Sequence, residues 1–282
     1  MKLRLYHHAD GARIAYRQAG TGPGLVLLHS SGLSYREWEP VVEHLAHRFR
    51  LVLPDLPGHG DSEDRPRHPY TPDWLAEVIA GFCTETAGPH PLVAGHAGGA
   101  ELLLRAVVNG QLAPARMVLM SNRLHASAQH PLSVKLGRMG ARAAAIPGVD
   151  RAVSHLAPWL IRPKRGPRLS ARGEPAASDL IRHAYADAPG NANRARTWAK
   201  IVRAWPRGAQ PELLAAYPQL QMPVLLLWAD SDRIHPLGPA EEALARLPRG
   251  QLRVLPDTGF LIAYDDPVGV ARELSAFCGA RG

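Results

Sequence analysis

The chain has 282 residues, with 33 Lys and Arg against 25 Asp and Glu, which gives a net charge of +8. Its length favours one domain, or one domain with an insertion, and a chain of this size can bury enough surface to be stable without disulfides. No apolar run is long enough to span a membrane, and residues 1–10 lack the apolar core of a signal peptide, so we expect a cytoplasmic protein with no membrane partner.

Predicted strands and helices alternate along most of the chain. Apolar runs rich in β-branched residues are separated by segments of helical periodicity, which predicts an α/β protein with a mostly parallel, doubly wound sheet covered by helices on both faces. Helix-capping and helix-breaking residues mark most of the predicted helix ends. The predicted strands are 13–19, 25–29, 51–54, 91–95, 117–121, 224–228 and 252–255, and the predicted helices are 73–86, 98–109, 239–247 and 267–277.

This alternation stops after residue 122 and resumes at residue 222. The intervening hundred or so residues are helical in pieces and rich in proline. A structureless loop of that length inside a compact domain is uncommon, so the segment is better explained as a subdomain. We predict a core of residues 1–121 and 222–282, and a helical, basic cap of residues 122–221 inserted after the sixth strand.

The positive charge is concentrated in this insertion. Residues 121–210 contain 16 Lys and Arg but four Asp and Glu, a net charge of +12, which leaves −4 for the remainder. Such a segment attracts anions and would suit an anionic substrate or an acidic carrier protein, although a solvated helical surface has the same composition. No nucleic-acid-binding motif accompanies the charge. None of the 14 His falls in a clear metal-ligand motif, so we expect no metal, no cofactor and no nucleic acid.

Residues 93–99, Val-Ala-Gly-His-Ala-Gly-Gly, follow an apolar strand and open a helix. A Gly-x-Ser-x-Gly turn in that setting is the nucleophile elbow of the α/β-hydrolase superfamily, which this chain resembles. The resemblance covers nearly the whole chain and implies the α/β-hydrolase fold. Four further segments resemble the family in the same order: LLHSSG at 27–32, DLPGHGDS at 55–62, LWADSDRI at 227–234 and GFLIAYDDP at 259–267.

Two positions depart from the family pattern. Ala97 stands where the resemblance places the nucleophile, and Phe260 stands where it places the general base, whereas Asp232 matches the catalytic acid. A methyl group cannot attack a carbonyl and a phenyl ring cannot carry a proton, so serine esterase chemistry is not expected. Ala97 is equally unsuited to the related epoxide hydrolases and dehalogenases, which use a carboxylate there.

Other groups remain that can act on a carbonyl. The resemblance implies an oxyanion hole made of the backbone N–H groups of Gly98 and of Ser30 or its neighbour. Asp232, without its usual histidine, is expected to be partly desolvated, with a raised pKa that suits a proton acceptor, although it could simply cap its own turn. His235 lies in a loop at the carboxyl edge of the sheet and is either a substitute base or a solvent-exposed side chain.

Four more residues are expected to line the pocket: His29, Ser31, His96 and Trp38. Each has an alternative. His29 and His96 could be structural side chains that pack beside the elbow, and no base is evident for the hydroxyl of Ser31.

The sequence therefore predicts an atypical α/β-hydrolase-fold tailoring enzyme that moves a proton next to a carbonyl, by epimerisation, cyclisation or elimination, in bacterial natural-product or peptide biosynthesis. In its loss of the serine triad it is similar to the ribosomal-peptide epimerase type. Two alternatives stay open: a non-catalytic protein that binds a small molecule or peptide, and a slow hydrolase in which Asp232 or His235 activates water directly.

Overall fold

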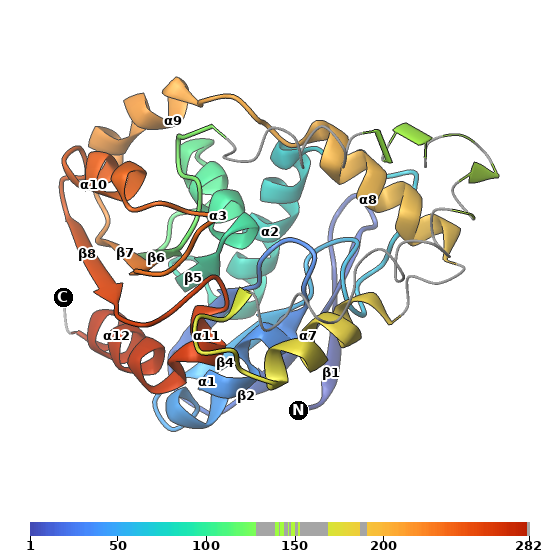
Figure 1. Ribbon diagram of the computed structural model, residues 1–282. Coiled ribbons are helices and arrows are strands. Elements are labelled where there is room, and N and C mark those ends of the chain that lie inside the picture. The colour runs from blue at the N-terminus through green and yellow to red at the C-terminus, as the bar shows by residue number, and fades with distance from the viewer. Residues whose placement is uncertain are drawn as a thin grey trace.

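The computed structural model describes residues 1–127, 169–186 and 191–280, together with residues 139, 140, 142, 143, 146, 148, 149 and 152 (Figure 1). Its centre is a sheet of eight strands in the order β1-β2-β4-β3-β5-β6-β7-β8. The pairs from β4 to β8 are all parallel, whereas β2 is antiparallel to both β1 and β4. The prediction of a mostly parallel sheet is confirmed.

The seven predicted strands are confirmed to within two residues. The strand at the edge, β1, was not predicted because only one of its five side chains is buried, so its sequence contains no apolar run. The strands are β1 Leu3–His7, β2 Arg13–Ala19, β3 Gly24–Leu28, β4 Arg50–Pro54, β5 Leu92–His96, β6 Arg116–Met120, β7 Val224–Ala229 and β8 Gly250–Leu255.

The four predicted helices, α2, α3, α10 and α12, are confirmed to within three residues. The short α1, of seven residues, was not predicted. None of the helices in the described part of the chain is long and apolar enough to cross a membrane. The helices are α1 Glu39–Leu45, α2 Pro72–Ala87, α3 Gly98–Val108, α7 Ala176–Tyr185, α8 Ala192–Ala204, α9 Pro211–Ala216, α10 Gly238–Leu244, α11 Ile262–Asp265 and α12 Pro267–Gly279.

Helices cover both faces of the sheet (Figure 1). Successive side chains of a strand point to opposite faces. Leu25 and Leu27 of β3 accordingly pack with α1 and α12 on one face, while Val26 and Leu28 pack with α2, α3 and α10 on the other. Because both faces are buried, the central strands are apolar at nearly every position, and this feature made them predictable.

Helices α7, α8 and α9 lie between β6 and β7 in the chain, inside the predicted cap. Helix α8 is fixed to the loop that follows β4: Nε of Arg194 donates to Oδ2 of Asp64 at 2.9 Å, and Nε1 of Trp198 donates to the Gly58 carbonyl at 2.8 Å. Many residues of the predicted cap, including 128–138 and 153–168, lie outside the described residues. The division into core and cap stays a prediction.

Candidate active site

One residue, Ala97, makes the turn between β5 and α3. Its φ of 46° and ψ of −114° lie in a region that residues with a Cβ rarely adopt. The turn is held by its surroundings. The Ala97 N–H donates to the Met120 carbonyl of β6 at 3.1 Å, and a Cβ at Gly99 would lie only 2.6 Å from the His29 carbonyl oxygen. The backbone of a nucleophile elbow is therefore present although the side chain at its tip is a methyl group.

Two backbone N–H groups lie beside this turn, and one of them is not the one expected. The N–H of Ser30 donates to Oε2 of Glu37 at 2.6 Å, so it is already occupied and cannot bind an oxyanion. The Ser31 N–H takes its place: a Cβ at Gly98 would lie 3.2 Å from the Ser31 nitrogen. Neither Gly98 nor Ser31 donates its N–H to any described residue. These two groups form the candidate oxyanion hole.

Asp232 and His235 form a buried pair at the carboxyl end of β7. Nδ1 of His235 donates to Oδ2 of Asp232 at 2.9 Å, and the backbone N–H of Ile234 donates to Oδ1 at 2.7 Å. Nε1 of Trp228 donates to the His235 carbonyl at 3.1 Å and fixes the loop. The expectation that Asp232 lacks a histidine partner is thus wrong, because its own loop folds back and supplies one.

The expected rise in the pKa of Asp232 is also wrong. Burial does favour the neutral carboxyl, but the hydrogen bond and charge of His235, the Ile234 N–H and the charge of His96 outweigh it, so the pKa lies below the ordinary value. The Asp232 side chain has no exposed surface. A carboxylate that is ionised, enclosed and hydrogen-bonded is a poor proton acceptor. It is well suited to orient the imidazole of His235.

Phe260 lies in the loop after β8, where the resemblance to the family places the catalytic histidine. The centre of its ring lies 4.8 Å from that of His96 and 5.8 Å from that of His235. The phenyl ring therefore contacts both imidazoles. Phe260 is half-buried and packs with an apolar cluster that contains Leu180 of α7 and Leu261. Phe260 thus connects the loop after β8 to helix α7 of the insertion.

A second carboxylate, Glu37, was missed by the sequence analysis. It is 1% exposed, accepts the Ser30 N–H through Oε2, and forms a short hydrogen bond to Nδ1 of His96 through Oε1. Burial favours the neutral carboxyl and raises the pKa of Glu37. The charge and hydrogen bond of His96, together with the Ser30 N–H, outweigh burial, so the pKa lies below its ordinary value. A lone acidic residue in a short 3₁₀ helix, Tyr35–Trp38, gives no sequence signal of this burial.

The remaining predicted lining residues divide between the interior and the surface. Nδ1 of His29 donates to the Ser30 carbonyl at 2.8 Å and its Nε2 accepts the Leu56 N–H at 2.8 Å, so both nitrogens are used and burial lowers its pKa. Trp38 packs fully buried in the core below the sheet, so its prediction as a lining residue is wrong. Ser31 is exposed beside the elbow.

A cavity of about 540 Å³ opens next to Asp232 and Phe260. Its wall joins the segment before α7 to the Phe260 loop. Oδ2 of Asp265 accepts the N–H groups of Ala171 at 2.8 Å and Gly259 at 2.7 Å, and Oδ1 accepts the hydroxyl of Ser170. The residues around the cavity include Leu169, Ser170, Ala171, Asp232, Gly259 and Phe260.

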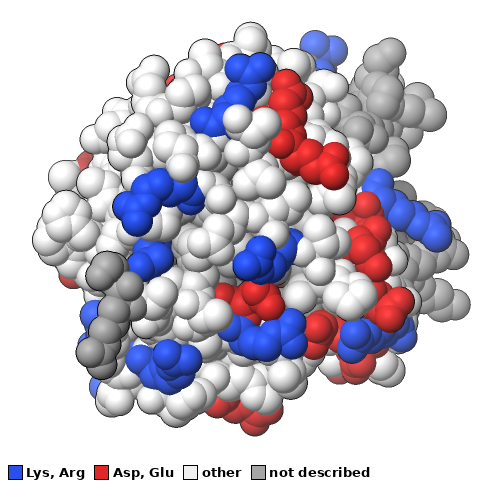
Figure 2. Space-filling model, turned by 90° about the vertical axis from the view of Figure 1, so that its left-hand side faces the viewer, with Lys and Arg blue, Asp and Glu red and all other residues white. Residues whose placement is uncertain are grey.

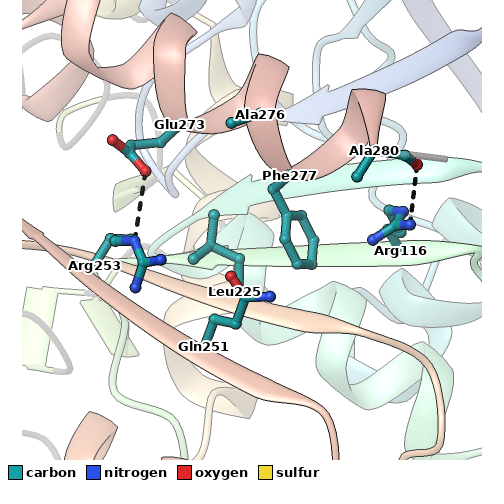
Figure 3. Close-up of a pocket in the computed structure, with 8 residues that line it drawn as sticks. All are labelled: Arg116, Leu225, Gln251, Arg253, Glu273, Ala276, Phe277 and Ala280. Atoms are coloured by element: carbon teal, nitrogen blue, oxygen red, sulfur yellow. Dashed lines mark hydrogen bonds and ion pairs between the residues drawn. The ribbon is translucent and has the colours of Figure 1, made fainter. Parts of the chain in front are cut away.

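A smaller cavity, of about 140 Å³, lies at the opposite edge of the sheet (Figure 3). Its floor is apolar, with Phe277 between two arginines. Arg116 donates to the Ala280 carbonyl at 3.0 Å, and Arg253 lies 3.9 Å from Glu273. It is formed at the amino ends of β6, β7 and β8, whereas ligands of open α/β sheets bind at the carboxyl ends. The candidate site is therefore the larger cavity.

The fold and the elbow define an α/β-hydrolase. The sequence profile of the alpha/beta hydrolase family matches residues 25–273, so the chain belongs to that family.

Individual proteins that are similar to this chain carry several names. The chain is 28% identical to the pimeloyl-[acyl-carrier protein] methyl ester esterase of Nitrosomonas europaea over 267 residues, which cover 88% of this chain and 92% of the relative. It is 27% identical to the magnesium-chelatase 30 kDa subunit of Rhodobacter capsulatus over 243 residues, 86% of this chain and 81% of the relative. The solved structure of a thermophilic esterase from Thermogutta terrifontis superposes with a TM-score of 0.80 at 23% identity, covering 99% of this chain and 98% of that one.

Proposed function

We propose that this chain is an enzyme that moves a proton next to a substrate carbonyl, giving epimerisation, cyclisation or elimination, with His235 as the base. The observation that carries the proposal is the Asp232–His235 pair, in which a buried carboxylate accepts Nδ1–H at 2.9 Å. A carboxylate bound to one imidazole nitrogen orients the other toward its task as a general base. Asp232 is then a positioning residue, and Nε2 of His235 takes the proton.

The Gly98 and Ser31 N–H groups complete this proposal. When a proton leaves the carbon next to a carbonyl, negative charge develops on the carbonyl oxygen. Preorganised donors at that position stabilise the enolate, and such electrostatic stabilisation is often the largest single contribution to catalysis. Ala97 offers no hydroxyl that would divert the substrate into an acyl-enzyme. The retained donors and the absent nucleophile together support chemistry at the α-carbon.

The comparisons support a carbonyl compound as substrate, because relatives and structural neighbours are named esterases. The name of the Nitrosomonas relative adds an acyl-carrier protein to the proposal as partner. The +12 segment suits an acidic carrier, although Arg123 and Arg194 within it already pair with Glu101 and Asp64. Basic and acidic side chains are interspersed on the face shown in Figure 2, so that face is no candidate for the contact. The biosynthetic setting and the cytoplasmic location stay predictions.

A second candidate function is ligand binding without turnover. It is favoured by Phe260, whose apolar ring packs against both His96 and His235. Hydrolysis by directly activated water is a third candidate, favoured by the names of the relatives. It lacks the covalent intermediate that divides the barrier, so we expect it to be slow.

The proposal is tested by hydrogen exchange in deuterated buffer. The probe is the α-methylphenylacetyl thioester of N-acetylcysteamine, which mimics a carrier-bound acyl group, and its α-proton is followed by NMR. We expect exchange by the wild type, a loss of at least about 100-fold in His235→Asn for the enantiomer whose α-proton His235 takes, and no change in His47→Asn, an exposed histidine beyond α1. Tight binding of the thioester without exchange would support the binding protein, and release of free thiol by the wild type would support the hydrolase.

A further inference from the structure

The structure contains a second carboxylate–histidine pair in contact with the Phe260 ring. Glu37 binds Nδ1 of His96, as Asp232 binds Nδ1 of His235. In both pairs the carboxylate is enclosed: the Glu37 side chain is 2% exposed and that of Asp232 has no exposed surface. Each imidazole contacts the same phenyl ring. Two similar pairs thus meet at one phenyl ring near the elbow.

One nitrogen of the His96 ring lacks a partner. Nε2 of His96 is fully buried and has no hydrogen-bond partner in the described part of the chain. Buried polar atoms in native proteins almost always have a partner, and exceptions call for an explanation such as a catalytic role. The purely structural role expected for His96 would be satisfied by its bond to Glu37, and it leaves Nε2 unexplained.

We infer that His96 is a second catalytic residue, which exchanges a proton with the substrate from the face opposite His235, so that the reaction is the inversion of a stereocentre next to a carbonyl. The inference rests on the proposed function and narrows it from three outcomes to one. Cyclisation and elimination need no base on each face of the carbon. Epimerisation through a planar enolate is served directly by such a pair of bases, because the proton leaves one face and returns to the other.

The proton balance is complete without a cofactor. Neutral Nε2 of His235 takes the α-proton, the electrons of the C–H bond form the enolate, and the oxygen charge is held by the Gly98 and Ser31 N–H groups. The protonated Nε2 of His96 then donates to the opposite face of the carbon and the carbonyl re-forms. The reverse direction uses the same two groups in exchanged roles. Nothing is oxidised or reduced, and both rings return to their starting state by exchange with solvent.

Phe260 must move for this reaction to occur. Its ring contacts both imidazoles, and it is also one of the residues around the 540 Å³ cavity. A substrate that enters from the cavity therefore meets the phenyl ring first. The ring has to rotate away from the imidazoles before the α-carbon can reach the two Nε2 atoms.

Glu37 is the positioning residue of the second pair. Its two carboxylate oxygens are divided between the His96 ring and the Ser30 N–H. Since the Ser30 N–H is thereby kept away from the pocket, Ser31 rather than Ser30 faces Gly98. Glu37 thus connects the second base to the oxyanion hole through a single side chain.

The inference is tested with the separate R and S enantiomers of the α-methylphenylacetyl thioester in deuterated buffer. The wild type should exchange the α-proton of both enantiomers and interconvert them. His235→Asn should lose exchange of one enantiomer by at least about 100-fold and retain exchange of the other, and His96→Asn should show the opposite preference. Interconversion should be lost in both variants. His47→Asn serves as the control.

Outcomes for the two proposals are distinguishable. Absence of exchange in the wild type would overturn the proton-transfer function, and the second base with it. Exchange in the wild type that His96→Asn leaves unchanged for both enantiomers would overturn the second base alone. A variant that loses exchange of both enantiomers equally while remaining folded, as judged by circular dichroism and thermal denaturation, would also contradict a base assigned to one face.

Two further measurements do not depend on the stability of His96→Asn. In the first turnovers of the wild type, the inverted product should carry solvent deuterium while the remaining substrate carries none. A single base would instead return part of the original proton to the product. Glu37→Gln keeps an acceptor for the Ser30 N–H but removes the charge beside His96. We expect it to change the pH profile of exchange for the enantiomer that His96 deprotonates and to leave the other profile unchanged.

Discussion

Oδ2 of Asp265 accepts the backbone N–H of Gly259 at 2.7 Å, and this bond sets the position of the loop that carries Phe260. The same carboxylate accepts the N–H of Ala171 and the hydroxyl of Ser170, from the segment that leads into α7. Asp265 is 3% exposed. One buried side chain therefore joins the helical insertion to the loop on which the family places its catalytic histidine.

Asp265→Asn should lower the free energy of unfolding by about 2 kcal/mol, because an amide offers one acceptor oxygen where the carboxylate offers two, and buried N–H donors lose their partner. Urea denaturation measures the change. Asp257→Asn is the matched control, since Asp257 is exposed and its positive φ of 54° is tolerated by asparagine. Equal stability of the two variants would contradict the role of Asp265.

Arg194 and Arg182 should respond differently to the same substitution. Arg194 of α8 is 6% exposed and donates to Asp64 and to the Gly60 carbonyl, whereas Arg182 of α7 pairs with Asp179 on the surface. Arg194→Met should cost about 2 kcal/mol because it leaves a carboxylate and a carbonyl unpaired. Arg182→Met should cost less than about 1 kcal/mol. Thermal and urea denaturation of the pair of variants checks the contrast.

The stability of the protein should fall as the pH is lowered from about 6.5 toward 3, owing in part to His59. Burial, with the nearby charges of His29 and Arg194, lowers the pKa of His59 to about 3 in the folded state. Between the two pKa values, His59 binds a proton in the unfolded chain but not in the folded one. The stability that the neutral His59 provides is therefore present above the unfolded pKa and is lost as the pH falls below it.

His59→Gln should therefore reduce the slope of unfolding free energy against pH between pH 6 and 4 by up to about 1.4 kcal/mol per pH unit. Urea denaturation at several pH values measures the slope, which is independent of any constant loss of stability from the substitution. The exposed His47→Gln is the control and should leave the slope unchanged. An unchanged slope in His59→Gln would show that His59 is protonated in the folded protein.

Restoring the family residues with Ala97→Ser and Phe260→His should give only a trace of nitrophenyl ester hydrolysis. The backbone at Ala97 already has the elbow conformation, but Oδ2 of Asp232 is occupied by His235. A histidine introduced at 260 must compete for it. Adding His235→Gln should raise the rate several-fold, and Phe260→His alone, which lacks a nucleophile, should give none. Activity of the double variant that falls when His235 is removed would contradict this competition.

The sequence predicted the sheet well because its central strands are buried on both faces and therefore apolar throughout. The elbow and the acid turn were found for another reason: each is a short local motif. Contacts between distant segments could not be found in this way. Glu37 meets His96 across 59 positions in the chain, and no pattern within either segment reports the contact.

The error at Asp232 had a different origin. Burial alone would raise the pKa of Asp232. The three-residue turn that brings His235 onto the carboxylate reverses the shift, and the sequence does not reveal this turn. Ser30 and Ser31 show the same limit at smaller scale. Both are plausible donors in sequence, and only the carboxylate of Glu37, which occupies the Ser30 N–H, decides between them.

The conformation of Ala97 is imposed by the close packing of β5 and α3, where a Cβ at Gly95 would come within 2.7 Å of the Ala100 nitrogen, and not by any chemistry of the side chain at the tip. The turn therefore tolerates a change of residue without a change of shape. In an evolving lineage, the reaction type can then be altered by substitutions at the tip and in the loops around it, while selection for stability acts on the glycines beneath.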